Sequence, residues 1–146
     1  MKAVKIALAG RDRYLAFTVE AMFQIEEAFG GTQELNGRLM ESSREGFADT
    51  CKAAAILAEQ GELARRHMGY EPSPMLSAED IATTTDPMGL PTLKSAIISA
   101  IMLGYGREIE PEDDEVDLGL AELNEQKKRG EAGPLPPDRG AVRVLP

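Results

Sequence analysis

Residues 3–17 alternate loosely between apolar and polar side chains, as half-buried β-strands do. Val4, Ile6 and Leu8 fall on one side of the first run. Gly10 opens a turn sequence, and an extended pattern resumes after it. This alternation predicts a β-hairpin at the N-terminus.

A helical pattern follows the hairpin directly. Thr18 stands where an N-cap residue is expected, because its hydroxyl can accept a hydrogen bond from the first helical turn. Met22, Ile25 and Phe29 recur at helical spacing, and Gly30 supplies a stop signal. The pattern predicts a helix between Thr18 and Gly30.

A second helix is predicted to start near Ser43. Gly61 interrupts its pattern, since glycine is a poor helix former, and residues 62–68 are predicted to add a short helix of their own. Pro72 and Pro74 then mark a loop. The apolar stripe of the second helix consists of Phe47, Cys51, Ala54, Ala55 and Ala58.

Two further helical segments complete the pattern. Ser77, followed by Glu79 and Asp80, is typical of a capped helix start, and a short helix is predicted from there to about Thr84. The last segment begins at Asp86, and one face of its helix carries Leu93, Ala96, Ile97, Ala100, Ile101 and Gly104.

The last helix is apolar on nearly every side, because Ile98 and Met102 lie outside that face. Such a helix either lies centrally in the core or covers an interface with another chain. We therefore predict a surface for self-association or partner binding that consists of Leu93, Ile97, Ile98, Ile101 and Met102.

Charge divides the chain into three blocks. Residues 1–107 hold 14 acids and 11 bases and contain all the strand and helix patterns. Residues 108–128 hold nine acids against two lysines, and residues 129–146 are rich in glycine and proline. Because like charges and prolines oppose a packed core, we predict a folded domain over residues 1–107. Residues 108–146 are predicted to be a largely disordered tail, acidic first and then Gly/Pro-rich.

Composition indicates the fold class. Only 5% of the 146 residues are aromatic and none is tryptophan, so the core depends on Leu, Ile, Met and Ala, which suit packed helices. We predict a mainly α fold, with an N-terminal β-hairpin followed by a small helical bundle.

The net charge of −9 disfavours nucleic acid and anionic membranes as partners, since no basic stripe opposes the repulsion. The longest apolar stretch, around residues 96–103, is too short to span a bilayer. The N-terminus lacks the long apolar core of a signal peptide, and these features together indicate the cytoplasm.

Few residues could support catalysis. His67 is interpreted as a surface histidine, because its neighbours on a polar helical stretch include no orienting acid. Cys51, the one cysteine, fits an apolar helix stripe as a small buried side chain. The acidic run over residues 110–117 lacks the central glycine of a calcium loop. We predict no enzyme activity, no cofactor and no metal site.

Several segments carry a family resemblance, and they occur in a fixed order. Residues 13–30 read as a basic-aromatic-hydrophobic strand, then Glu20-Ala21, then an ending of aliphatic-Glu-Glu-x-Phe-Gly type. Residues 56–61, residues 76–81 and the helix over residues 93–104 extend the likeness across the predicted domain. This ordered set resembles the tail assembly chaperones of long-tailed (siphovirus-type) phages, prophages and gene transfer agents.

The resemblance implies a function in phage tail assembly. Such chaperones bind the tape measure protein and keep its apolar helical surface from aggregating while tail tube subunits polymerise around it. They act in the host bacterial cytoplasm, tend to self-associate and are absent from the mature virion. The implied partners are therefore the tape measure protein, the tail tube protein and further copies of this chain.

Two other functions stay open. A DNA-associated cytoplasmic helical adaptor would need a basic recognition helix, and Arg44 and Lys52 are outnumbered by nearby acids. A small structural head–tail connector is compatible with the sequence. A connector differs from a chaperone because it remains in the finished particle.

Lys127 and Lys128 suggest a hypothesis about coding. Chaperones of the resembling family often have a longer form, made by a backward ribosomal slip, and adjacent lysine codons can form a slippery run. The alternative is an ordinary basic patch that closes a short acidic helix.

Overall fold

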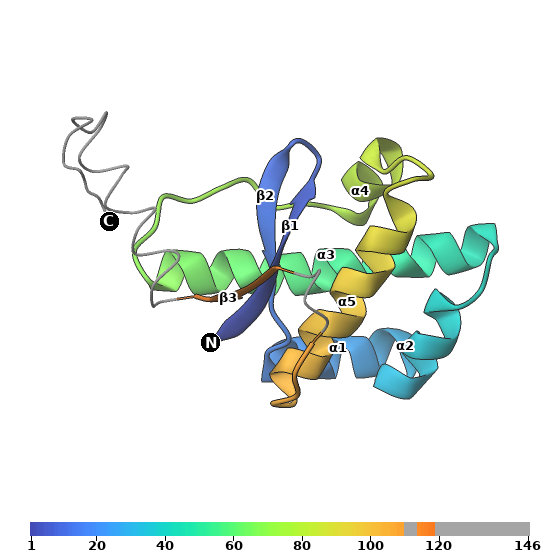
Figure 1. The fold of residues 1–146 in the computed structure, drawn as a ribbon, viewed down its shortest axis with the longest axis horizontal. Coiled ribbons are helices and arrows are strands. Elements are labelled where there is room, and N and C mark those ends of the chain that lie inside the picture. The colour runs from blue at the N-terminus through green and yellow to red at the C-terminus, as the bar shows by residue number, and fades with distance from the viewer. Residues whose placement is uncertain (110–113, 119–146) are drawn as a thin grey trace.

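The computed structural model describes residues 1–109 and 114–118, and its fold is mainly helical with an N-terminal β-hairpin, as predicted (Figure 1). The elements follow in the order β1 (Lys2–Leu8), β2 (Arg11–Leu15), α1 (Val19–Phe29), α2 (Thr32–Leu39), α3 (Arg44–His67), α4 (Ala78–Thr84), α5 (Leu90–Gly104) and β3 (Asp114–Asp117).

The strands form a small antiparallel sheet in the order β2-β1-β3. β1 pairs with β2 as the predicted hairpin, with Val4 opposite Leu15. On its other edge β1 pairs with β3, with Lys2 opposite Asp117. The sheet therefore joins the first strand of the chain to one that lies more than a hundred residues later.

β3 extends the described fold beyond residue 107, where the folded domain was predicted to end. Val116 and Leu118 are buried in a small second core, where like-charge repulsion was expected to keep this segment in solvent. Cations of β1 offset that repulsion: the N-terminal amine lies 3.0 Å from Asp117 Oδ1, and Lys2 Nζ lies 2.8 Å from Glu115 Oε2. The rest of the predicted tail, with Lys127 and Lys128, lies outside the described residues.

The predicted caps of α1 are confirmed. The N–H of Ala21 donates to Thr18 Oγ1 over 3.1 Å, so the threonine side chain caps the first turn. Gly30 ends the helix in the left-handed region, with φ of 100°, which glycine adopts without steric cost. The capped helix start predicted at Ser77 is also confirmed, and the structure shows it as a capping box with Asp80 at the start of α4.

α2 has no counterpart among the predicted elements. It starts directly after Gly31, and only Leu35 and Leu39 are buried on it. Gly37 lies within the helix and lowers its intrinsic propensity. Two apolar residues four positions apart are too weak a pattern to indicate a helix from the sequence.

α3 is one continuous helix, so the predicted interruption at Gly61 is wrong. Glycine is needed there for a close approach of two elements. A Cβ atom at Gly61 would lie 1.7 Å from the carbonyl oxygen of Tyr14 on β2. Next to this point the N–H of Ala16 donates to the carbonyl of Leu57 over 3.1 Å, which joins the hairpin to the middle of α3.

α5 is central to the core. It crosses α3 in Figure 1 and contacts β1, β2, α2 and α3. Its residues Leu93, Ala96, Ile97, Ala100 and Leu103 are buried together with the inner faces of the other helices. The sequence allows α5 either a central position in the core or an interface with another chain. The structure places most of its circumference in the core.

Candidate partner-binding surface

The structure divides the five predicted surface residues into two groups. Leu93 and Ile97 are fully buried in the core, so they offer no surface to a partner, and this part of the prediction is corrected. They were included because the apolar pattern does not show which side of α5 meets α3 and the sheet. Ile98, Ile101 and Met102 are half-buried and remain candidates.

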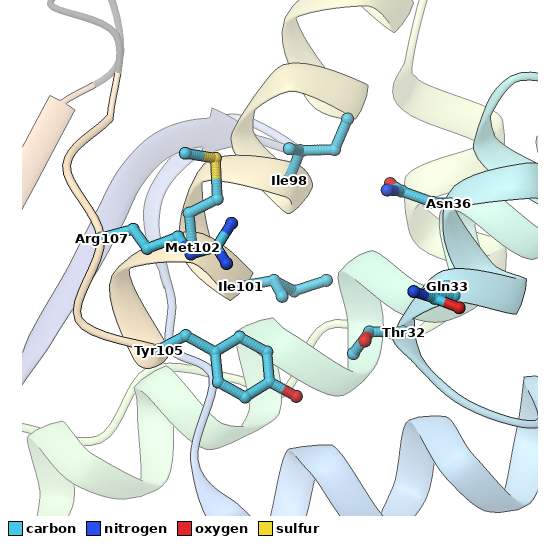
Figure 2. A pocket seen from close by; sticks show the side chains of 8 residues that line it. All are labelled: Thr32, Gln33, Asn36, Ile98, Ile101, Met102, Tyr105 and Arg107. Carbon is cyan, nitrogen blue, oxygen red and sulfur yellow. The ribbon is translucent and has the colours of Figure 1, made fainter.

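These three residues form one wall of a groove between α5 and α2. The groove has a volume of about 250 Å³. Figure 2 shows Ile98 and Ile101 pointing from α5 toward α2, whose facing side chains form the second wall. The lining residues are Thr32, Gln33 and Asn36 from α2, Ile98, Ile101 and Met102 from α5, and Tyr105 and Arg107 just after α5.

The two walls differ in chemistry. The α5 wall is aliphatic, whereas the α2 wall carries a hydroxyl from Thr32 and side-chain amides from Gln33 and Asn36. An aliphatic wall can bury apolar side chains of a partner, and amides can donate and accept hydrogen bonds at the edge of such a contact. The groove therefore suits an amphipathic partner segment. The sequence pattern does not predict the polar wall, because it does not predict α2.

A second hollow of about 250 Å³ adjoins this groove. Met22 and Glu26 of α1 line it together with Glu34 of α2. Thr32, Gln33 and Tyr105 line both hollows, so the two lie on either side of these residues.

Tyr105 stands between the hollows and is 54% exposed. Its ring contacts that of Phe17, with centroids 5.2 Å apart and planes tilted by 55°. A Cβ atom at Gly104 would lie 2.5 Å from the Phe17 ring, so glycine permits the close contact that positions Tyr105. Tyr105 is not among the surface residues that the sequence pattern predicts. Its position directly after the apolar helix was the one feature of the sequence that could have indicated it as a surface residue.

The methionine side chains lie at or near the surface of the protein. None of the seven methionines is buried: Met22 and Met102 are half-buried and the other five are exposed. Met40 and Met88 are 79% and 86% exposed. Methionine is flexible and polarisable, so an exposed methionine can adapt to partner surfaces of different shape.

The chain's potentially reactive residues lie elsewhere. Cys51 is buried on α3, and burial raises the pKa of its thiol, which disfavours the nucleophilic thiolate. His67 is exposed at the end of α3, as predicted. In the described part of the chain, no three His, Cys, Asp or Glu side chains gather as a metal site would require.

Glu62 forms a buried ion-pair network with a structural role. Its carboxylate lies 2.8 Å from Arg65 Nη1 and 2.9 Å from Arg66 Nε, and it accepts a hydrogen bond from the N–H of Ser73 over 2.7 Å. Burial alone would raise the pKa of Glu62, but the hydrogen bonds from Ser73, Arg66 and Arg65 outweigh it and lower the pKa. The network holds the loop after α3 against that helix.

Comparison with known proteins found no matching family model, no matching curated protein and no matching solved structure. Across residues 1–109 and 114–118, no helix combines the length and the apolar character needed to cross a membrane.

Proposed function

We propose that this chain is a tail assembly chaperone of a long-tailed phage, a prophage or a gene transfer agent. It binds the tape measure protein in the host bacterial cytoplasm while tail tube subunits polymerise, and it leaves before the particle is complete. The segment-by-segment resemblance over residues 13–30 and the later helices supports this proposal.

The observation that carries the proposal is an open groove with an aliphatic wall that includes Met102, on a chain whose methionines are all at least partly exposed. A tape measure protein is a long series of helical segments of varying sequence. A chaperone for such a partner needs an apolar surface that adapts to many segments rather than one that fits a single segment. A groove flanked by flexible side chains meets that need.

The same groove can hold a second copy of this chain when the tape measure protein is absent, which accounts for the self-association that the proposal includes. The tape measure protein is the preferred occupant, because two copies that each carry a net charge of −9 repel one another.

The proposal is tested by co-expression of this chain with the tape measure protein of the same phage, prophage or gene transfer agent. We expect the tape measure protein to stay soluble and to co-purify with the wild-type chain. Ile98→Glu should abolish co-purification, because it places a charge on the aliphatic wall of the groove. Ala82→Glu is the matched control, since Ala82 is exposed on α4, and it should behave as wild type.

Two results would contradict the proposal. One is a tape measure protein that is equally soluble without this chain. The other is equal loss of co-purification in Ile98→Glu and Ala82→Glu, which would mean that added charge alone is responsible. Circular dichroism of each variant checks that it remains folded.

A further inference from the structure

We propose that one flank of α1, with Tyr105 beside it, is a docking surface for an amphipathic helix that carries lysine or arginine next to its apolar stripe. The flank consists of Val19, Met22, Phe23 and Glu26, and we call it the α1 flank. The inference deepens the proposed function and depends on it, because it names the chemistry of the partner segment that the chaperone holds.

The four residues share one side of the helix. They stand at positions i, i+3, i+4 and i+7, and an α-helix with 3.6 residues per turn brings such positions onto one flank. The inward face of α1 lies on the adjoining side and carries the buried residues Ala21, Ile25 and Phe29. Val19, Phe23 and Glu26 are exposed, so these three residues are not needed to attach the helix to the core.

The apolar part of this flank is open to solvent. Val19 is 67% exposed and Phe23 is 50% exposed, which is unusual for side chains of this size standing next to each other. Met22 lines the second hollow, where it meets Tyr105. The α1 flank thus borders the groove between α2 and α5, and the hollow between them is lined mainly by polar side chains, among them Gln33 and Glu34.

The glutamates beside the α1 flank determine the charge of the partner helix that can bind there. Glu26 and Glu34 line the hollow beside Met22, and neither forms an ion pair with any described residue. Glu20 and Glu27 lie on the next side of α1, where Lys52 is the one cation that lines the same depression.

Lys52 provides little compensation, because its ammonium group lies over the ring of Phe29, 5.9 Å from the centroid, on the side of α1 away from Tyr105. An acidic helix, including one from a second copy of this chain, would be repelled from the α1 flank. A helix with lysine or arginine beside its apolar stripe would place cations against Glu26 and Glu34.

The probe is a synthetic helical peptide with leucines at i, i+3, i+4 and i+7 and lysines beside them. A second peptide has glutamate in place of each lysine. We expect the full chain to bind the lysine peptide in a fluorescence anisotropy titration and to bind the glutamate peptide far more weakly. Added salt should weaken the lysine complex, because it screens the carboxylates of the surface.

Variants locate the site. Glu26→Lys should weaken binding of the lysine peptide roughly five- to tenfold, since it turns an attraction into a repulsion. Glu71→Lys makes the same charge change at an exposed loop position and should leave the affinity unchanged. Phe23→Ser should weaken both peptides, and Phe23→Leu should retain most of the binding.

Equal binding of the two peptides, or equal effects of Glu26→Lys and Glu71→Lys, would overturn the inference. Binding of the tape measure protein by the same variants distinguishes failure of this inference from failure of the proposed function. If that protein is bound equally by wild type, Glu26→Lys and Phe23→Ser, the α1 flank is not the docking surface although the chaperone function stands. If only the lysine peptide is bound, the surface stands and the proposed function fails.

Discussion

Two helical glycines in this chain have opposite surroundings. Gly61 lies where α3 touches the backbone of β2, whereas a Cβ atom at Gly37 on α2 would have no atom within 4 Å. Neither glycine has a positive φ, so the difference between them is one of space and not of backbone strain. The same residue type therefore has a tertiary role at one position and none at the other.

Gly61→Ala should lower the free energy of unfolding by about 3 kcal/mol, because the methyl group forces the hairpin away from α3. Gly37→Ala should be neutral or raise it by up to about 1 kcal/mol, since alanine is the better helix former. Urea denaturation of both variants measures the difference. A Gly61→Ala chain as stable as wild type would mean that α3 and β2 are not in contact.

Glu62 predicts a specific pH dependence. Its folded pKa is lowered, so the stability that its ion pairs contribute is complete above about pH 4.3, the usual pKa of glutamate. That contribution is lost as the pH falls through the lower, folded pKa. Glu62→Gln should cost about 2 kcal/mol at neutral pH and remove this part of the acid dependence. Parallel stability curves for wild type and Glu62→Gln between neutral and acid pH would contradict the account.

At the scale of elements, the sheet depends on a strand that comes late in the chain. Val116 of β3 and Leu118, the residue directly after this strand, belong to the small core that includes Ala3 and Tyr14. This core covers the face of the hairpin beside the end of α3. The edge of β1 would otherwise be left unpaired, with open hydrogen-bonding groups.

Leu118→Ser should therefore lower the free energy of unfolding by about 2 to 3 kcal/mol, because it removes a fully buried side chain. Met88→Ser serves as the control at an exposed position and should have no measurable effect. Thermal melting of both variants gives the comparison. If Leu118→Ser and wild type melt together, β3 does not belong to the folded core.

Structural features that depend on residues close together in the chain were predictable from the sequence. The ends of α1 follow from Thr18 and Gly30, whose roles depend on neighbouring residues in the chain. Gly61 was misread because its partner, the carbonyl of Tyr14, is distant in the sequence. β3 was missed for the same reason, since its pairing with β1 depends on residues at the opposite end of the chain.

The candidate groove was half predictable. Ile98 and Met102 were selected because they are apolar residues outside the main stripe of α5, and both line the groove. Leu93 was selected on the same helix but is buried, since the pattern alone does not orient α5. The wall formed by α2 required the tertiary arrangement of two helices.

At the scale of the whole molecule, an acidic chain carries exposed apolar side chains on α1 and at five methionines, together with half-buried ones on α5. Net charge keeps such a molecule dispersed, and the apolar surface gives it affinity for partners. The balance between the two depends on ionic strength, because salt screens the repulsion but strengthens apolar contact only slightly.

The isolated chain should therefore self-associate more strongly as salt is raised. Light scattering should report an average mass that increases with sodium chloride concentration. Ile98→Glu should lower that mass while the chain stays folded, because the groove between α2 and α5 is then closed to a second copy. A wild-type chain that is monomeric at every salt concentration would remove self-association from the proposal.

The most direct test of the chaperone function is the ratio of this chain to the tape measure protein before and after tail assembly. Tape measure protein is isolated from cells in which tube polymerisation is blocked, and again from finished particles, and mass spectrometry quantifies both proteins. The account predicts that the chain accompanies the tape measure protein in the blocked cells and is missing from the particles. Equal ratios in both samples would identify a structural component such as a connector, and absence from both would contradict binding to the tape measure protein.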